Sequence, residues 1–420
     1  MSLDCFYSFH GLNYKSGYHT TCPTNTDELH KFDGSLPSQF WNSQGFKDFR
    51  LKLWNNQWPR GCHLCQECER DGLKSMRDDL REFIYPEYFN TETGEMDFEG
   101  LYQLEVRFNN SCNMACLHCD TVYSSLWESR LKKYKPTEED HEYNLFQLTK
   151  TRHKAASDKP GRLSVDLEET KAIFEDMNKN FPNLTRYDCS GGEPLKQKQF
   201  LYSLELLANH PNASNMDILM YTNFNADFNV DDLYELFKPF KRIKLSISID
   251  AGKNIYEYFR DGSWDKLEAN IKHIRELDKV NRKIQMKGIL TYSIFQLMDI
   301  EDVYRSICSL NIDRLDSAPV QTPQYINPSL IMKLYPDQMR EDFRSTREFI
   351  ESLDDGSRRY DSIVNSFNEL EQYTLNTWME DHWLSSFFKY RAKIDKLWNK
   401  NFNNHFTNYM INDRKLVRCL

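Results

Sequence analysis

Three cysteines, Cys112, Cys116 and Cys119, lie close together in the stretch "NNSCNMACLHCD". A cubic 4Fe-4S cluster has four irons, and an electron-transfer site usually gives each iron one thiolate. Three thiolates therefore leave one iron open to a small molecule that binds through two atoms, as a catalytic zinc site keeps one position open. The same spacing also fits a zinc ion whose site is completed by His118 or by a distant side chain.

Short apolar runs alternate with amphipathic stretches from residue 101 onward. This alternation predicts strands that are each followed by a helix, and therefore an α/β fold whose parallel sheet curls into a partial (β/α)6 TIM-like barrel. Ligands of such barrels bind at the carboxyl ends of the strands, and the three cysteines directly follow the first strand. The predicted strands are 101–108, 184–189, 217–222, 242–249, 283–292 and 312–320, and predicted helices include 168–181, 264–277 and 299–310.

The pattern C-x3-C-x2-C after a first barrel strand resembles the radical S-adenosylmethionine (SAM) enzymes, and the resemblance covers roughly residues 101–320. It implies that Cys112, Cys116 and Cys119 hold the catalytic 4Fe-4S cluster and that SAM chelates the open iron. Reductive cleavage of SAM would then give a 5′-deoxyadenosyl radical that abstracts hydrogen from a substrate. His118 departs from the family pattern, which often has an aromatic residue here, but an imidazole can still stack on adenine or donate a hydrogen bond.

The segment "CSGGEP" follows the second predicted strand. Gly191 and Gly192 allow the backbone to approach a ligand closely, and Glu193 can accept charge-assisted hydrogen bonds from an ammonium group. The resemblance implies that this is the Gly-Gly-Glu motif that holds the amino group of SAM.

Polar side chains also follow the next two predicted strands. Asn223 comes after 217–222, and Ser246, Ser248 and Asp250 close the strand at 242–249, where alternation turns the two serines to the same side. The resemblance implies contacts with the ribose and the methionine carboxylate of SAM. Arg260 is assigned to that carboxylate or to substrate, with an ordinary surface arginine as the alternative.

A second metal site is predicted near the N-terminus, where five cysteines are available. The segment resembles the auxiliary-cluster module of the twitch or SPASM type, which implies a second 4Fe-4S cluster. Cys5 lacks the usual Pro-Trp neighbourhood and Cys68 competes with it, so either residue is the fourth ligand; a structural zinc is the alternative. The five candidates are Cys5, Cys22, Cys62, Cys65 and Cys68.

These features predict three consecutive domains. Residues 1–95 form the auxiliary-cluster domain, 96–325 the partial barrel, and 326–420 a helical C-terminal extension. Residues 134–165 are a polar insertion in the barrel, interpreted as a solvated loop or as a cover over the barrel mouth.

Composition narrows the classes of protein. The net charge of −9, with Lys and Arg spread along the chain, disfavours broad binding to nucleic acid. No apolar run is long enough to span a membrane and no signal peptide is recognised, so a cytoplasmic protein is predicted. In that reducing compartment the eleven cysteines are expected to be metal ligands or catalytic groups rather than disulfides.

The leading hypothesis is therefore an enzyme that performs radical hydrogen abstraction. A peptide or protein substrate is implied by the family association alone, with oxidation of a sugar or nucleoside as the alternative, and flavodoxin or ferredoxin as the expected electron donor. A non-catalytic zinc or iron-sulfur protein is the competing class. The sequence predicts neither the product nor the oligomeric state.

Overall fold

The computed structural model describes most of the chain. The described residues are 5–15, 18–25, 27, 29–31, 33–70, 72, 74–77, 85–142, 145 and 165–406. Most of the predicted polar insertion at 134–165 and the last residues of the predicted C-terminal extension therefore lie outside them.

The chain divides into two compact units, each of which combines segments from distant parts of the sequence. The sequence predicted consecutive domains instead, and their boundaries at residues 95 and 325 stay predictions. The first unit consists of Met1–Asn110, Lys159–Tyr221 and Asp231–Lys244, and the second of Ser111–Asp158, Thr222–Val230 and Leu245–Leu420.

The first unit is built on a sheet whose described strands are β1 (Gly11–Lys15), β2 (Tyr18–Thr20), β3 (His30–Lys31), β4 (Gln103–Val106), β5 (Arg186–Cys189) and β6 (Asp217–Thr222). Their order is β3-β2-β1-β4-β5-β6. Strands β1, β4, β5 and β6 are parallel, and β2 and β3 extend the β1 edge in the antiparallel direction. The predictions of β4, β5 and β6 are confirmed, but β1 was not predicted, because "GLNYK" is too short to show a clear alternation.

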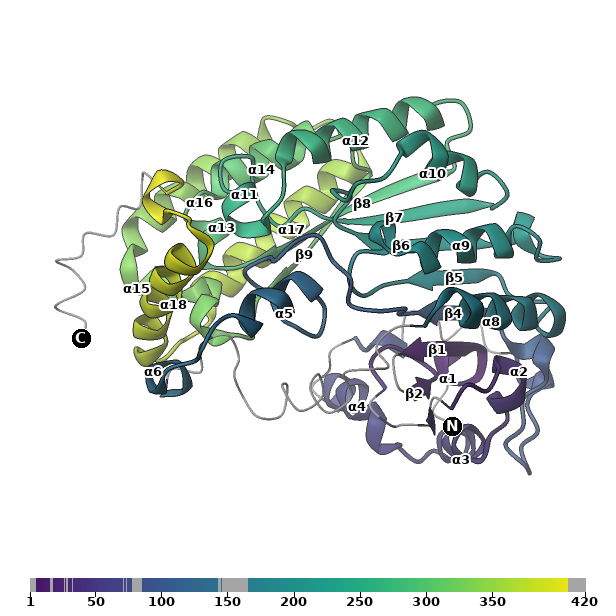
Figure 1. Cartoon of the computed structure of the whole chain (residues 1–420). Helices are drawn as coiled ribbons and strands as arrows, with labels where there is room; N and C mark the ends of the chain where they lie inside the picture. The colour runs from purple at the N-terminus through teal and green to yellow at the C-terminus, as the bar shows by residue number, and fades with distance from the viewer. Residues whose placement is uncertain are drawn as a thin grey trace. The chain divides into compact units, whose positions relative to one another are not determined.

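Two helices cover one face of this sheet (Figure 1). They are α8 (Leu167–Asn180), which confirms a predicted helix, and α9 (Lys198–Leu207). The ring of Tyr187 on β5 lies 5.5 Å from Phe174 of α8 and 6.4 Å from Phe200 of α9, measured between ring centroids. Because all three rings are fully buried, this contact forms the core between the helices and the sheet.

The second unit contains the parallel pair β8 (Ile284–Tyr292) and β9 (Arg314–Pro319). Helix α17 (Arg358–Asn376) packs on β9, and Ser362 Oγ accepts a hydrogen bond from Leu315 N at 3.0 Å. Both strands were predicted, and together with the strands of the first unit they confirm the α/β class with a parallel-strand sheet.

Helices account for most of the remaining second unit (Figure 1). The helices predicted at 264–277 and 299–310 are confirmed. The predicted C-terminal extension is helical where the structure describes it. Strand β7 (Arg242–Ser248), also predicted, leads from the first unit into the second. The longest of these helices are α12 (Trp264–Asp278), α14 (Ile300–Ser309), α16 (Pro336–Glu351) and α18 (His382–Trp398).

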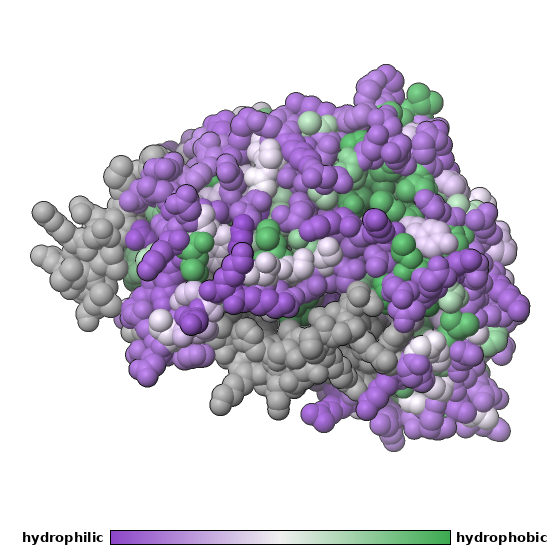
Figure 2. Space-filling view, viewed as in Figure 1, coloured by the Kyte–Doolittle hydropathy of each residue, from purple (hydrophilic) through white to green (hydrophobic). Residues whose placement is uncertain are grey.

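Among the described helices, none is both long and apolar enough to cross a bilayer. The face seen in Figure 2 is largely hydrophilic, with small separate hydrophobic patches.

A buried histidine connects the start of the chain to residues that precede β4 in the same unit. His10 is fully buried, and its Nε2 accepts a hydrogen bond from Tyr85 N at 2.9 Å. The ring proton must therefore lie on Nδ1, which is 2.7 Å from the Gly100 carbonyl oxygen and donates to it. Burial lowers the pKa of His10 to about 4, although the bond to Gly100 raises it.

This depressed pKa predicts a pH-dependent stability. Between the usual histidine pKa of about 6.5 and the folded value, the unfolded chain binds a proton that the folded chain does not, so the free energy of unfolding should fall as the pH falls. Urea unfolding of wild type and His10→Gln at pH 7 and pH 5 measures this effect. The wild type should lose more stability than the variant between the two pH values, and equal losses would contradict the assignment of a neutral His10.

Candidate active site

The three predicted cluster ligands lie on one loop of the second unit, directly after β4 in the chain. Cys112 and Cys116 are buried, and Cys119 is half-buried. The loop turns tightly, because Cys119 N donates a hydrogen bond to the Cys116 carbonyl oxygen at 2.9 Å. Leu117 N donates to the Phe259 carbonyl oxygen at 3.0 Å, which ties the loop to the segment after β7.

Two side chains outside the loop, one of them far away in the sequence, donate hydrogen bonds to its carbonyl groups. The indole nitrogen of Trp127 donates to the Cys116 carbonyl oxygen at 2.8 Å. The Tyr390 hydroxyl, on α18, donates to the Leu117 carbonyl oxygen at 2.8 Å. Trp398, at the end of the same helix, packs edge-on against Trp127 with ring centroids 4.8 Å apart. The C-terminal helix therefore supports the cysteine loop directly.

The thiols of the loop are held in surroundings that oppose their ionisation. Burial raises the pKa of Cys116 to about 12, the Arg260 guanidinium lowers it, and Cys112 raises it again. Burial also raises the pKa of Cys119. Such thiols become thiolates when a metal provides positive charge, and three sulfur donors suit a soft metal or an iron-sulfur cluster.

The loop does not resemble the site of a single metal ion. Within the described ranges, no three His, Cys, Asp or Glu side chains are arranged as ligands of one ion. A cubane binds each thiolate through a different iron, so its ligands do not converge on one atom.

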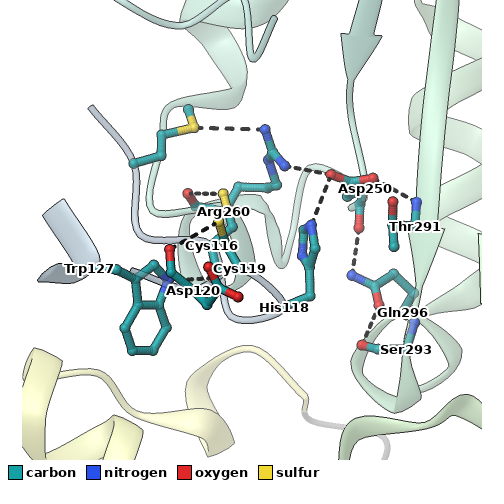
Figure 3. Close-up of polar contacts among 11 residues, drawn as sticks. Cys116, His118, Cys119, Asp120, Trp127, Asp250, Arg260, Thr291, Ser293 and Gln296 are labelled. Atoms are coloured by element: carbon teal, nitrogen blue, oxygen red, sulfur yellow. Dashed lines mark hydrogen bonds and ion pairs between the residues drawn. The ribbon is translucent and has the colours of Figure 1, made fainter. Parts of the chain in front are cut away.

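A buried ion pair lies beside the loop (Figure 3). Arg260 Nη1 donates to Asp250 Oδ2, and the two residues are 4% and 1% exposed. The interpretation of Arg260 as a surface arginine is therefore wrong. Asp250 Oδ1 also accepts a hydrogen bond from Thr291 N at 2.6 Å, and the Asp250 carbonyl oxygen accepts one from Gln296 Nε2 at 2.5 Å. These contacts fix the carboxylate, and through it the guanidinium.

His118 lies between this ion pair and an aromatic ring. It stacks on Phe259 with ring centroids 5.2 Å apart and planes 14° apart, and its Nε2 is 3.7 Å from Asp250 Oδ2. Burial lowers the pKa of His118 to about 4, although Asp250 raises it, so the ring is neutral near pH 7. Its buried Nδ1 has no hydrogen-bond partner in the part of the chain that the structure describes. A neutral ring of this kind suits either predicted role, stacking or hydrogen bonding.

Asn223 also reaches the cysteine loop. Its Nδ2 donates to Asn113 Oδ1 at 2.9 Å and lies 3.9 Å from Cys112 Sγ. Asn113 in turn donates to the Asn225 carbonyl oxygen at 3.1 Å. The second unit thus brings together the predicted residues Cys112, Cys116, Cys119, His118, Asn223, Asp250 and Arg260.

The two predicted serines of β7 differ in burial. Ser246 is fully buried, and its Oγ has no partner among the residues described. Ser248 is half-buried at the end of the strand. Asp250 then adopts a positive φ of 52°, which turns the chain sharply after β7.

The predicted Gly-Gly-Glu motif lies in the first unit, after β5. Gly191 and Gly192 have φ values of 83° and 58°, a conformation that side chains disfavour. Glu193 is fully buried, and its Oε1 accepts a hydrogen bond from Leu195 N at 3.1 Å. Gln197 Nε2 donates to the Gly191 carbonyl oxygen at 3.0 Å. The motif therefore forms a defined turn with a buried carboxylate.

The N-terminal cysteines separate into a group of four and a single residue. Cys5, Cys22, Cys62 and Cys65 all line one cavity in the first unit, whereas Cys68 is not among its lining residues. Burial raises the pKa of Cys5 to about 12 and raises that of Cys22. Four sulfur donors around one space fit an iron-sulfur cluster. Among the described residues, no three of these side chains are arranged as ligands of a single ion.

Several residues of the site were not predicted. Asn113 and Gln296 contact the predicted residues Asn223 and Asp250 through their side-chain amides, and Asn225 N donates to Asn223 Oδ1 at 2.8 Å. Met114 Sδ lies 4.0 Å from Arg260 Nη2. Trp127 and Tyr390 carried no signal in the sequence, because their contacts with the loop depend on the tertiary fold. The asparagines follow predicted strand ends, as Asn223 does, and could have been included on that ground.

Comparison with known proteins identifies the central part of the chain. Residues 106–303 match the model of the Radical SAM superfamily. The chain therefore contains a radical SAM domain and is an enzyme whose reaction is unassigned, which confirms the predicted class. A comparison with the curated proteins finds no match.

Partial matches to solved structures were also found. One is native anSMEcpe with bound AdoMet and the Kp18Cys peptide, at 16% identity and a TM-score of 0.33, with 51% of each chain covered. Another is Streptococcus suis SuiB bound to the precursor peptide SuiA, at 14% identity and a TM-score of 0.32, with 64% of this chain and 55% of that chain covered. This chain spans little more than half the length of these structures.

Tyr390 on α18 holds the cysteine loop through a hydrogen bond. We therefore expect Tyr390→Phe to destabilise this loop. The variant leaves the Leu117 carbonyl oxygen without its donor, which should cost about 1–3 kcal/mol of stability by urea unfolding. After anaerobic reconstitution, iron should also be lost to a chelator faster than from wild type.

Tyr304→Phe is the matched control, because the buried Tyr304 hydroxyl bonds to Ser366 Oγ at 3.1 Å, away from the loop. It should change stability without changing iron retention. If the two variants retain iron equally well, Tyr390 does not support the cluster loop.

Proposed function

We propose that this enzyme cleaves SAM reductively at a 4Fe-4S cluster and uses the resulting radical to abstract hydrogen from a substrate. The single observation that carries the proposal is that Cys112, Cys116 and Cys119 share one buried loop. When bound and reduced, the cluster supplies the electron that cleaves a carbon–sulfur bond of SAM, giving methionine and a 5′-deoxyadenosyl radical.

The residues around the loop have separate roles in this proposal. The three cysteines hold three of the four irons and leave the fourth for SAM. Arg260 is a donor for the methionine carboxylate, because its buried Nε has no partner among the described residues. Asp250 keeps the guanidinium in place and balances its charge.

The remaining residues orient the rest of SAM. Asn223, Ser246 and Ser248 are donors for ribose and carboxylate oxygens, and the neutral His118 ring contacts the adenine. Glu193, with Gly191 and Gly192 shaping its turn, accepts the hydrogen bonds of the amino group.

A second cluster is proposed at the N-terminal cavity, with Cys5, Cys22, Cys62 and Cys65 as ligands. The shared cavity supports Cys5 rather than Cys68 as the fourth ligand. The proposed substrate is a peptide or protein, and the proposed electron donor is a flavodoxin or ferredoxin, as the family resemblance implies.

The main test is the formation of 5′-deoxyadenosine. Cys116→Ala should abolish its release from SAM by anaerobically reconstituted, dithionite-reduced protein, because the open-site cluster loses a ligand. Cys308→Ala is the matched control, since Cys308 lies on α14, outside both cysteine groups. Normal cleavage by Cys116→Ala, or loss in the control alone, would contradict the proposal.

The second cluster is tested by metal content. Replacing both Cys62 and Cys65 with alanine should lower the iron from about eight to about four per chain. Cys68→Ala should leave the iron unchanged, because Cys68 lies outside the cavity. Zinc in the wild type, or iron loss in Cys68→Ala equal to that of the double variant, would contradict the assignment.

A further inference from the structure

The cavity of the four N-terminal cysteines is lined by hydroxyl-bearing residues as well as by sulfur. Besides the cysteines, its lining includes Ser8, Thr24 and Met76. A hydroxyl group can both donate and accept a hydrogen bond, whereas the thioether of methionine can only accept one, and weakly. The sulfur atom to which each hydroxyl donates therefore matters for any metal centre that the cavity holds.

Thr24 lies between two of these sulfur atoms. Its Oγ1 is 3.4 Å from Cys22 Sγ and 3.8 Å from Met76 Sδ. Met76 is 52 residues away from Thr24 in the sequence, so the tertiary fold places the second sulfur at this hydroxyl. A hydroxyl has a single proton, and it can therefore make a full hydrogen bond to only one of the two sulfur atoms at a time.

One arrangement of protons satisfies both contacts as long as Cys22 is a protonated thiol. Met76 has no proton to give, so the Thr24 hydroxyl donates to Met76 Sδ. The Cys22 thiol then donates its own proton to Thr24 Oγ1. This arrangement depends on the thiol proton, because Thr24 has only one proton and has already used it.

The arrangement changes when Cys22 binds a metal, because cysteine binds metals as a thiolate. Cys22 Sγ is then a negatively charged acceptor with no proton to donate. Hydrogen bonds to a charged acceptor are roughly twice as strong as those between neutral groups. The Thr24 hydroxyl should therefore turn away from the weak acceptor Met76 Sδ and donate to Cys22 Sγ.

Burial gives the sulfur atom of Cys22 a need for such a donor. Cys5 and Cys22 are buried, whereas Cys62 and Cys65 are half-buried and can accept hydrogen bonds from water. Burial raises the pKa of the Cys22 thiol, and hydrogen bonds from the Thr24 side chain and from nearby backbone lower it. Burial likewise raises the pKa of Cys5 to about 12, and hydrogen bonds from Ser8 lower it. Both buried sulfur atoms thus have protein donors beside them.

A hydrogen bond to a ligand sulfur affects the electron affinity of an iron-sulfur cluster. Such bonds are among the factors that set the reduction potential of the cluster. A donor stabilises negative charge on the sulfur, and the reduced cluster has one more negative charge than the oxidised cluster. The donor therefore stabilises the reduced cluster more, and the reduction potential rises.

We propose that Thr24 is a positioning residue of the second cluster, whose hydroxyl donates to the Cys22 thiolate and raises the reduction potential of that cluster. This inference rests on the proposed function, because it requires an iron-sulfur cluster that is bound through Cys22. It adds a residue outside the four ligands that acts on the cluster through one of them.

The test is a redox titration of the reconstituted full-length enzyme, followed by electron paramagnetic resonance. The signal of the second cluster is the one that disappears when Cys62 and Cys65 are both replaced by alanine. Thr24→Val removes the hydroxyl and should lower the midpoint potential of this signal. We expect the reduction equilibrium to change at least threefold, which corresponds to about 28 mV for a one-electron step.

Two further variants separate this role from a structural one. Thr24→Ser keeps the hydroxyl and should keep the wild-type potential. Thr20→Val is the matched control, because Thr20 Oγ1 donates to the Cys22 carbonyl oxygen at 2.7 Å and not to its sulfur. This control should lower the urea midpoint and leave the potential unchanged. An unchanged potential in Thr24→Val, or an equal shift in Thr20→Val, overturns the assignment.

Iron content and protein stability are measured for every variant. If Thr24→Val does not bind iron, Thr24→Ala is titrated in its place, with the same expected shift and the same result that would overturn the assignment. Failure of the proposed function gives a different outcome. If replacing Cys62 and Cys65 removes no iron-sulfur signal, the second cluster and the role of Thr24 are both wrong. If the signal disappears but its potential does not depend on Thr24, only the role of Thr24 is wrong.

Discussion

The burial of three thiol groups beside an arginine is the constraint on which the candidate site depends. A buried thiolate is unfavourable unless positive charge lies nearby, and Arg260 provides only one such charge. Asp250 then neutralises part of it, and backbone and side-chain donors from Thr291 and Gln296 hold Asp250. The loop is therefore short of positive charge until a metal centre is present, which explains why this arrangement suits a cluster better than free thiols.

The support of this loop extends beyond the matched radical SAM segment. Tyr390 and Trp398 lie outside residues 106–303, yet they contact the loop directly or through Trp127. Backbone carbonyls that are bonded in this way keep the spacing of the sulfur atoms fixed. The C-terminal helix is thus part of the site in a physical sense, even though its sequence carries no recognisable catalytic motif.

The parts of the structure that could be predicted are those with local signals. Cysteine spacing and the Gly-Gly-Glu triplet are short motifs, and the strands β4 to β9 follow runs of apolar residues that alternation identifies. The burial of Arg260 could not be predicted, because it depends on Asp250 and on packing. The contact between Tyr390 and Leu117 joins residues 273 positions apart, and no local pattern reports such a pair.

The fourth ligand of the N-terminal cysteine group also could not be predicted from the local sequence. The sequence left open whether Cys5 or Cys68 is the fourth ligand, whereas the tertiary fold groups only Cys5 with Cys22, Cys62 and Cys65 around one cavity. Strand β1 was not predicted either, because its pairing with β4 is a property of the folded sheet.

The parallel pairing of β1 with β4 has a consequence for how the chain assembles. It joins segments separated by roughly ninety residues, so closing this loop costs chain entropy before the sheet can form. Cys22, Cys62 and Cys65 all lie inside the closed loop. A metal centre bound by these residues would cross-link the loop and reduce the entropy still to be lost, so metallation and strand pairing should favour one another during folding.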